Sequence, residues 1–171
     1  QRAKYNIRGE VLMFEWSDLM TAFWAFFLIL PLVSFIHQFG HWTMAKMMGG
    51  TSNLVIGRGK TILRVGPISF KRIYIADSSC TYKGLKINNK LGHILVHLGG
   101  VIFNLGSMLV LNLLIMINII PETTYFYQFG YFSVYYVFFA LLPIKYSEKH
   151  VSDGLAVYEI LKNFDPKDVT D

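Results

Sequence analysis

Charged residues are scarce in this chain of 171 residues, and their scarcity limits the class of protein it can be. Only 16% of its residues are charged, against roughly 25% in ordinary globular proteins, while 53% are hydrophobic and 16% are aromatic. This balance excludes an ordinary soluble domain and indicates a protein whose solvent is the lipid bilayer. The formal net charge of +5 is modest, and we attribute it to membrane topology rather than to nucleic-acid binding.

Cysteine is almost absent as well. Cys80 has no second thiol in the chain to pair with, which excludes an internal disulfide framework and leaves the redox compartment open. The chain starts at Gln1, and its first residues lack the basic, apolar and small-residue order of a signal peptide. The sequence could therefore be a processed form of the protein or a part of a longer protein.

Long apolar runs predict membrane-spanning helices, because about 20 apolar residues are enough to cross the hydrocarbon of a bilayer. We expect three core transmembrane helices, over residues 19–48, 91–120 and 125–142. Pro31 should kink the first helix, since a proline removes one backbone hydrogen bond. The expected fold class is therefore an all-α membrane protein.

The remaining segments complete the predicted domain, which is a single membrane-embedded unit over 1–171. Residues 1–18 should form an interfacial segment, and residues 152–163 a short C-terminal helix. Residues 51–79 contain β-prone runs punctuated by glycine, which predict a small hairpin or sheet at the membrane surface. That hairpin is either a mere connector or an edge strand to which an extended peptide is added.

Lysine and arginine are distributed unevenly along the chain. Nine of them lie between Lys46 and Lys90, none in the turn at 121–124, and four in the C-terminal tail. By the positive-inside rule, the β-prone segment and the C-terminus are cytoplasmic and the short turn is external. The three basic residues before residue 10 fit this orientation less well, and an upstream helix would account for them.

Two histidines stand four residues apart near the end of the first apolar run. His37 and His41 should lie on one face of a helix, close enough to bind one cation. A lone histidine would favour a hydrogen bond inside the bundle, but a pair inside a membrane helix favours a metal site, with zinc as the expected ion. His93 and His97 have the same spacing; we expect His97 to line the cavity or to bond between helices, and no second zinc site.

A zinc site needs a third protein ligand, which the spacing alone does not identify. Asp153 is the best candidate, because it is one of the few acidic residues near the membrane face that carries the histidines. The same side chain could instead be the N-cap of the helix predicted over 152–163. His150, Glu148 and Glu159 are competing candidates.

At this point three motifs, taken together, resemble the site-2 protease family of intramembrane zinc metalloproteases. They are the His37 and His41 pair in a membrane helix, the segment Gly100-Val101-Ile102-Phe103-Asn104, which looks like the family's Gly-x-x-x-Asn element, and Leu142-Pro143 followed by Asp153-Gly154. The first motif is specific, whereas the other two are weak alone and gain weight from their order. The resemblance covers most of residues 19–160.

The resemblance implies an activity, a cofactor and a set of site residues. It implies a zinc metalloendopeptidase in which His37, His41 and Asp153 bind Zn²⁺ and position 38 is the general base. Its substrate would be a membrane-embedded or membrane-associated peptide or protein, cleaved on the cytoplasmic side of a bacterial cell membrane by a multi-pass enzyme. A helical peptide bond is shielded, so the β-prone segment would hold the substrate in an extended form.

Three features depart from the family pattern. Gln38 replaces the expected glutamate, and an amide does not accept a proton from the attacking water, so we expect this chain to be close to inactive. Ala140 replaces an asparagine expected three residues before Pro143, and Asn104 is expected to take its part against the oxyanion or the substrate. Nine residues separate Pro143 from Asp153, more than in the compact form of the motif.

Gln38 has two possible origins, and it also supports an alternative function of a different class. A substitution that traps a substrate complex is favoured over a natural pseudoprotease. The rival is a non-catalytic membrane protein, either a pseudoprotease that binds a partner helix or a metal-handling permease. A permease would line a path with acidic or histidine side chains in all its helices, and residues 125–142 contain none.

Overall fold

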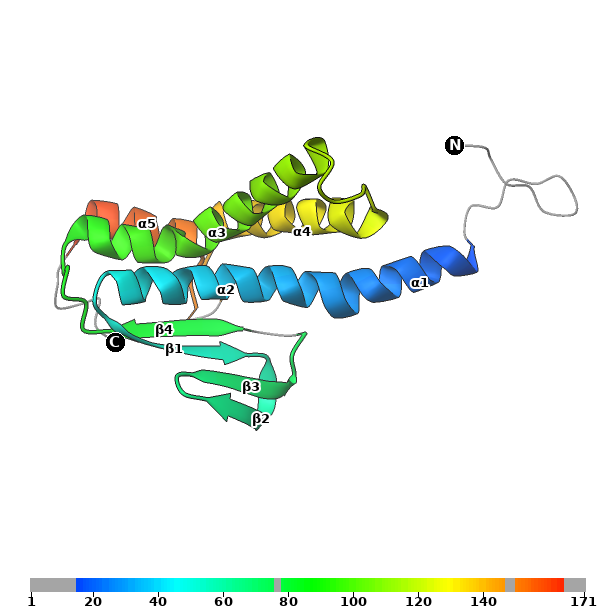
Figure 1. The fold of residues 1–171 in the computed structure, drawn as a ribbon. Helices are drawn as coiled ribbons and strands as arrows, with labels where there is room; N and C mark the ends of the chain where they lie inside the picture. Colours follow the sequence, from blue (N-terminus) through cyan, green and yellow to red (C-terminus); the bar gives the residue numbers. More distant parts are fainter. Residues whose placement is uncertain (1–14, 76–77, 147–149, 165–171) are drawn as a thin grey trace, which may run out of the picture.

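The computed structural model describes residues 15–75, 78–146 and 150–164. A long N-terminal helix lies between a β-sheet on one side and the remaining helices on the other (Figure 1). Most of the predicted interfacial segment 1–18 lies outside the described residues. The first helix already begins at Trp16, within that segment.

Three consecutive segments form the first long helix: α1 (Trp16–Trp24), the π-helical segment η1 (Ala25–Ile29) and α2 (Leu30–Met47). Pro31 lacks the N–H group that would bond to the carbonyl of Phe27, four residues earlier. The hydroxyl of Tyr74, at the end of the sheet, donates to this carbonyl at 3.1 Å. The donor that the proline removes is thus replaced from outside the helix, which ties the sheet to the helix.

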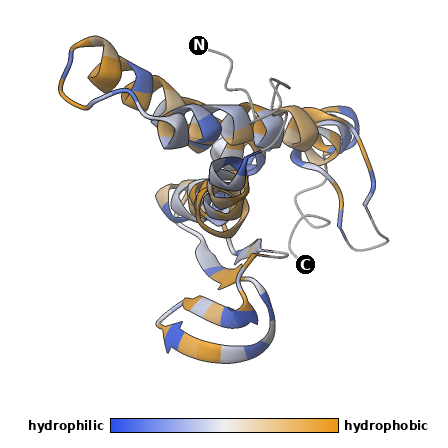
Figure 2. Ribbon diagram, turned by 90° about the vertical axis from the view of Figure 1, so that its right-hand side faces the viewer, coloured by the Kyte–Doolittle hydropathy of each residue, from blue (hydrophilic) through white to orange (hydrophobic). Residues whose placement is uncertain are grey.

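The sheet contains four strands: β1 (Thr51–Ile56), β2 (Arg58–Val65), β3 (Ile68–Ile73) and β4 (Ser79–Lys83). Their spatial order is β2-β3-β1-β4, with β1 and β3 parallel and the other pairs antiparallel. Alternate residues of β1, Ser52, Leu54 and Ile56, are buried, whereas β2 is exposed along its whole length. The sheet projects from one side of the helices (Figure 2).

The other helices are α3 (Lys90–Met116), α4 (Thr124–Leu141) and α5 (Asp153–Lys162). Helix α3 approaches α2 closely at a pair of glycines. A Cβ atom added to Gly40 would lie within 3 Å of the backbone of Gly99, and the reverse substitution would produce the same clash. Two small residues therefore let the two helices pack backbone against backbone, as in membrane helix pairs.

These elements correct the predicted fold class. The chain is a mixed α/β protein with a four-stranded sheet, not an all-α one, because the β-prone region continues past residue 79 to Lys83 and adds an edge strand. Within the described residues, two helices are long and apolar enough to cross a membrane, Trp16–Met47 and Lys90–Met116. The expected third spanning helix was wrong: α4 has 18 residues, but five of them are polar-tipped tyrosines.

Candidate metal centre

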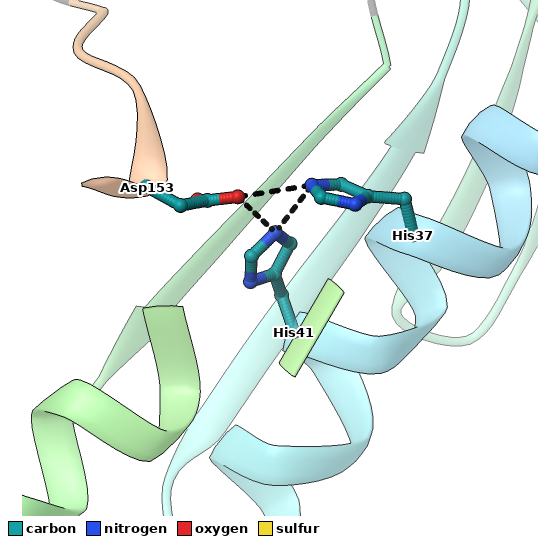
Figure 3. A group of neighbouring side chains, drawn as sticks. All are labelled: His37, His41 and Asp153. Atoms are coloured by element: carbon teal, nitrogen blue, oxygen red, sulfur yellow. Dashed lines mark hydrogen bonds and ion pairs between the residues drawn. The ribbon is translucent and has the colours of Figure 1, made fainter. Parts of the chain in front are cut away.

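His37 and His41, which we call the α2 pair, converge with Asp153 at one point. The Nε2 atoms of the two histidines are 3.0 Å apart, and they lie 3.0 and 3.5 Å from Oδ2 of Asp153. Figure 3 shows both imidazoles projecting from α2 and the carboxylate arriving from the start of α5. Among the described residues, these three are the one group of His, Cys, Asp or Glu side chains whose ligand atoms lie close enough together to hold one metal ion.

The backbone of α3 orients both imidazoles. Nδ1 of His41 lies 2.8 Å from the carbonyl oxygen of Val96; a carbonyl only accepts, so this nitrogen carries the proton and Nε2 keeps its lone pair. His37 interacts with the backbone of Gly100, where an added Cβ would lie 2.5 Å from the imidazole ring. A glycine is needed there because the ring packs directly against α3. Such outer contacts set the tautomer of a metal-binding histidine.

The donor set fits a divalent metal ion. Burial alone would raise the pKa of the Asp153 carboxyl, but hydrogen bonds with His37 and His41 hold that pKa below its usual range, so the group is a carboxylate. When no proton is shared among them, two imidazole nitrogens and one carboxylate oxygen face one another as electron-pair donors in a buried place. Only a shared proton or a cation can hold them together. Two histidines and one carboxylate are also the protein ligands of one class of hydrolytic zinc site, which keeps a fourth position open.

Residues on the two sides of the segment between Pro143 and Asp153 pair with each other, which brings Asp153 back toward the end of α4 despite the long spacing. The pairs are Lys145 with Val151 and Ile144 with Ser152. The hydroxyl of Ser152 donates to the carbonyl of Leu142 and accepts from the N–H of Leu155 at 3.1 Å. Ser152 rather than Asp153 is thus the N-cap of α5, which leaves the Asp153 carboxylate to face the α2 pair.

The other proposed site residues lie in different places. Gln38, His97, His150 and Glu159 line the same cavity as the α2 pair, and Glu148 lies outside the described residues. Asn104 is fully buried, with its Nδ2 atom 3.5 Å from Nδ1 of His37, and does not line the cavity. In this structure its side chain contacts His37 and is not part of the cavity lining.

A cavity of about 1250 Å³ opens beside the three converging side chains. One wall is strand β4, and the opposite wall comes from the end of α4 and the residues before α5. The sequence had not predicted β4, because Ser79–Lys83 is short and mostly polar; its signal was the alternation of Cys80 and Tyr82 with polar neighbours.

Within the described residues, strand β4 pairs with a strand on one side only, since it lies at the end of the strand order. The N–H of Leu54 bonds to the carbonyl of Pro67, so the backbone groups of Leu54 face β3. Its antiparallel partner, Cys80, is therefore in a non-hydrogen-bonded pair. The backbone N–H and C=O groups of Cys80, and of Tyr82 two residues later, point to the free edge, where an extended peptide could pair with them.

Comparison with known proteins finds a close relative. The Bacillus subtilis protein named "Uncharacterized membrane protein YwmF" is 51% identical over 150 residues, which cover 88% of this chain and 94% of that protein. No family model and no solved structure matches the chain. The two apolar helices and this likeness identify a membrane protein. The chain belongs to the same family as YwmF of Bacillus subtilis.

Proposed function

We propose that the chain is an intramembrane zinc metalloprotease of the site-2 type, which hydrolyses a peptide bond in or near the membrane segment of a peptide or protein precursor. The observation that supports this most is the convergence of the α2 pair with Asp153 in a cavity beside Gln38. Hydrolysis by this chain is slow, because Gln38 occupies the position of the general base.

In this proposal, His37, His41 and Asp153 hold the metal ion. Zinc bound there would polarise the scissile carbonyl and activate the attacking water. The carbonyl of Val96 keeps the lone pair of His41 turned toward the metal position. Gln38 can orient a water molecule by hydrogen bonding, but its amide does not take up the proton that this water must lose.

The substrate is bound as an extended strand along β4. The free backbone groups of Cys80 and Tyr82 supply donors and acceptors, and residues 78–82 line the cavity that contains the α2 pair. Strand addition holds the peptide by its backbone, and so tolerates varied side chains. It also unwinds the scissile bond, because a helical carbonyl is already hydrogen-bonded.

The proposed topology places the active site toward the cytoplasm of a bacterial cell. The two candidate spans, Trp16–Met47 and Lys90–Met116, are joined by a segment that contains the sheet, and nine of the 16 lysine and arginine residues lie between Lys46 and Lys90. Under the positive-inside rule this joining segment is cytoplasmic. His41 lies within two turns of the end of the first span, near that side.

The variant Gln38→Glu tests the proposal. Zinc-loaded protein in lipid nanodiscs is mixed with a test transmembrane substrate, and cleavage is followed by mass spectrometry. Because a positioned general base contributes about 10²–10⁴ in rate, cleavage should rise by a factor in that range. The double variant Gln38→Glu/His41→Ala is the control, since it has the base but lacks a metal ligand.

A second candidate function is supported by Gln38 itself. A pseudoprotease would bind zinc and a partner segment without cleaving it, and the natural glutamine would then be its signature. Zinc bound at the site without cleavage by Gln38→Glu would favour this candidate. Failure to bind zinc at the α2 pair would contradict both.

A further inference from the structure

A second pair of histidines, His93 and His97, lies next to the cavity; we call it the α3 pair. The hydroxyl of Tyr82 lies between the two rings, 3.1 Å from Nδ1 of His93 and 3.2 Å from Nε2 of His97. Beyond them, Nε2 of His93 lies 2.8 Å from Oδ1 of Asn88. Four side chains thus form one hydrogen-bonded series, which runs from the cavity wall to Asn88, an exposed residue two positions before α3.

The donors and acceptors of this series fix its direction. The amide oxygen of Asn88 only accepts, so Nε2 of His93 carries a proton, and Nδ1 of the neutral ring accepts. Tyr82 donates to that nitrogen; burial raises the pKa of Tyr82 to about 12, so its hydroxyl keeps its proton. A hydroxyl has one proton to donate, and therefore His97 must donate to Tyr82 through Nε2–H. The bonding pattern assigns His97 the tautomer with a lone pair on Nδ1.

This lone pair lies on a ring that lines the cavity. His97 borders the same cavity as His37, Gln38 and His41, and it follows directly after Val96, whose carbonyl binds His41. The His97 ring makes one hydrogen bond to the described residues, the bond to Tyr82. Nδ1 therefore has no protein partner in the described part of the chain and is left to a group inside the cavity.

We propose that His97 accepts the proton of the attacking water in this chain, with Tyr82 and His93 as positioning residues that fix its tautomer. This role rests on the proposed protease function. As the water oxygen bonds to the scissile carbonyl carbon, one water proton moves to Nδ1 of His97. When the C–N bond breaks, the same proton passes to the nitrogen of the leaving amine. The Nε2–H proton stays between His97 and Tyr82 throughout, so the ring returns to its starting state.

The tautomer is tested without any reaction. Nitrogen-15 NMR of histidine-labelled, metal-free full chain in nanodiscs should show His97 protonated at Nε2 and unprotonated at Nδ1. The variant Tyr82→Phe keeps the aromatic ring but removes the bridge, so its His97 signals should shift to those of mixed tautomers. A proton on Nδ1 of His97 in the unsubstituted chain would overturn the assignment, whatever the protein's activity.

The catalytic role is tested by comparing two backgrounds. In the Gln38 chain, His97→Gln should lower the residual cleavage rate by about 100-fold, the lower end of the contribution of a general base. In the Gln38→Glu chain the same substitution should cost at least about tenfold less, because Glu at position 38 takes the proton. Zinc content is measured for every variant, so that loss of metal is recognised.

Two outcomes would overturn the role of His97. Equal losses in both backgrounds would indicate a structural residue, and a Gln38 chain that cleaves no faster than its His97→Gln variant would show that no proton is taken there. If Gln38→Glu binds zinc but cleaves nothing, the proposed function fails instead, and the tautomer measurement still stands on its own.

Discussion

The α2 pair and the α3 pair of histidines have the same spacing but different third partners. The α2 pair meets the carboxylate of Asp153, whereas the α3 pair meets the hydroxyl of Tyr82. A hydroxyl satisfies two neutral imidazoles at once, because it donates to one ring and accepts from the other. A carboxylate has no proton to donate to either ring, and its negative charge repels the lone pairs on the ring nitrogens.

The side chain that contacts both histidines of a pair therefore determines whether the pair forms a hydrogen-bonded bridge or a possible metal site. Two imidazoles one helical turn apart are compatible with a metal ion or with a hydrogen-bonded bridge. In this molecule Tyr82 satisfies both rings of the α3 pair, whereas the α2 pair and Asp153 need a shared proton or a cation between them. The first arrangement suits a positioned base, and the second suits a metal centre.

The largest expected effect comes from removing the charge that distinguishes the α2 pair. Asp153→Asn keeps the size of the side chain but replaces a carboxylate with an amide. Because changes to residues behind a metal ligand already cost about 10–100-fold in affinity, zinc affinity should fall by more than about 100-fold. Competition with a fluorescent chelator measures this. The matched control is Glu159→Gln, which neutralises another carboxylate that lines the same cavity. If Asp153→Asn bound zinc as tightly as the unsubstituted chain, Asp153 would not be a zinc ligand.

A smaller effect is expected where α3 supports the α2 pair. In Gly100→Ala the added methyl group would lie 2.5 Å from the ring of His37, and overpacking of this kind lowers the free energy of unfolding by about 1–3 kcal/mol. Gly106→Ala on the same helix has nothing within 4 Å, and should gain up to about 1 kcal/mol from helix propensity. Denaturant titration in detergent measures both, and a Gly100→Ala chain as stable as Gly106→Ala would show that the ring is not packed against this glycine.

The smallest effect concerns Cys80, which lies two residues before Tyr82 on β4. A thiolate there would place a negative charge near the α3 pair. Burial raises the pKa of the Cys80 thiol to about 12, so the neutral thiol dominates near neutral pH and its reactivity should increase as the pH rises toward that value. Maleimide labelling at pH 8 should be at least about tenfold slower for Cys80 than for Thr81→Cys in a Cys80→Ser chain, where the exposed thiol faces the other side of β4. Equal rates would indicate a thiolate at Cys80.

The sequence predicted the long helices and the histidine pairs because both depend on local pattern. Apolar runs located the first two helices, and the i, i+4 spacing placed each pair on one helix face. It misjudged the third helix, because counting tyrosine as apolar hides its polar hydroxyl. It also missed β4, a short strand that exists by pairing with β1, whose partner residues lie 24 to 32 positions earlier in the chain.

The third partners could not be read from spacing. Asp153 reaches the α2 pair through a loop closed by Ser152, and Tyr82 reaches the α3 pair because β4 packs beneath the helices. The first contact joins residues 116 positions apart, and the second depends on how a strand packs on a helix 11 to 15 positions later. The close packing of α2 on α3 also buries Asn104 against His37, a contact that the sequence did not predict.

The central claim is that the α2 pair with Asp153 is a metal centre and the α3 pair is not. Zinc X-ray absorption, together with zinc stoichiometry of purified protein in nanodiscs, tests it directly. We predict one zinc per chain with imidazole nitrogen and carboxylate oxygen ligands, lost in His41→Ala and retained in His97→Ala. Zinc that survives His41→Ala, or that disappears with His97→Ala alone, would contradict the account.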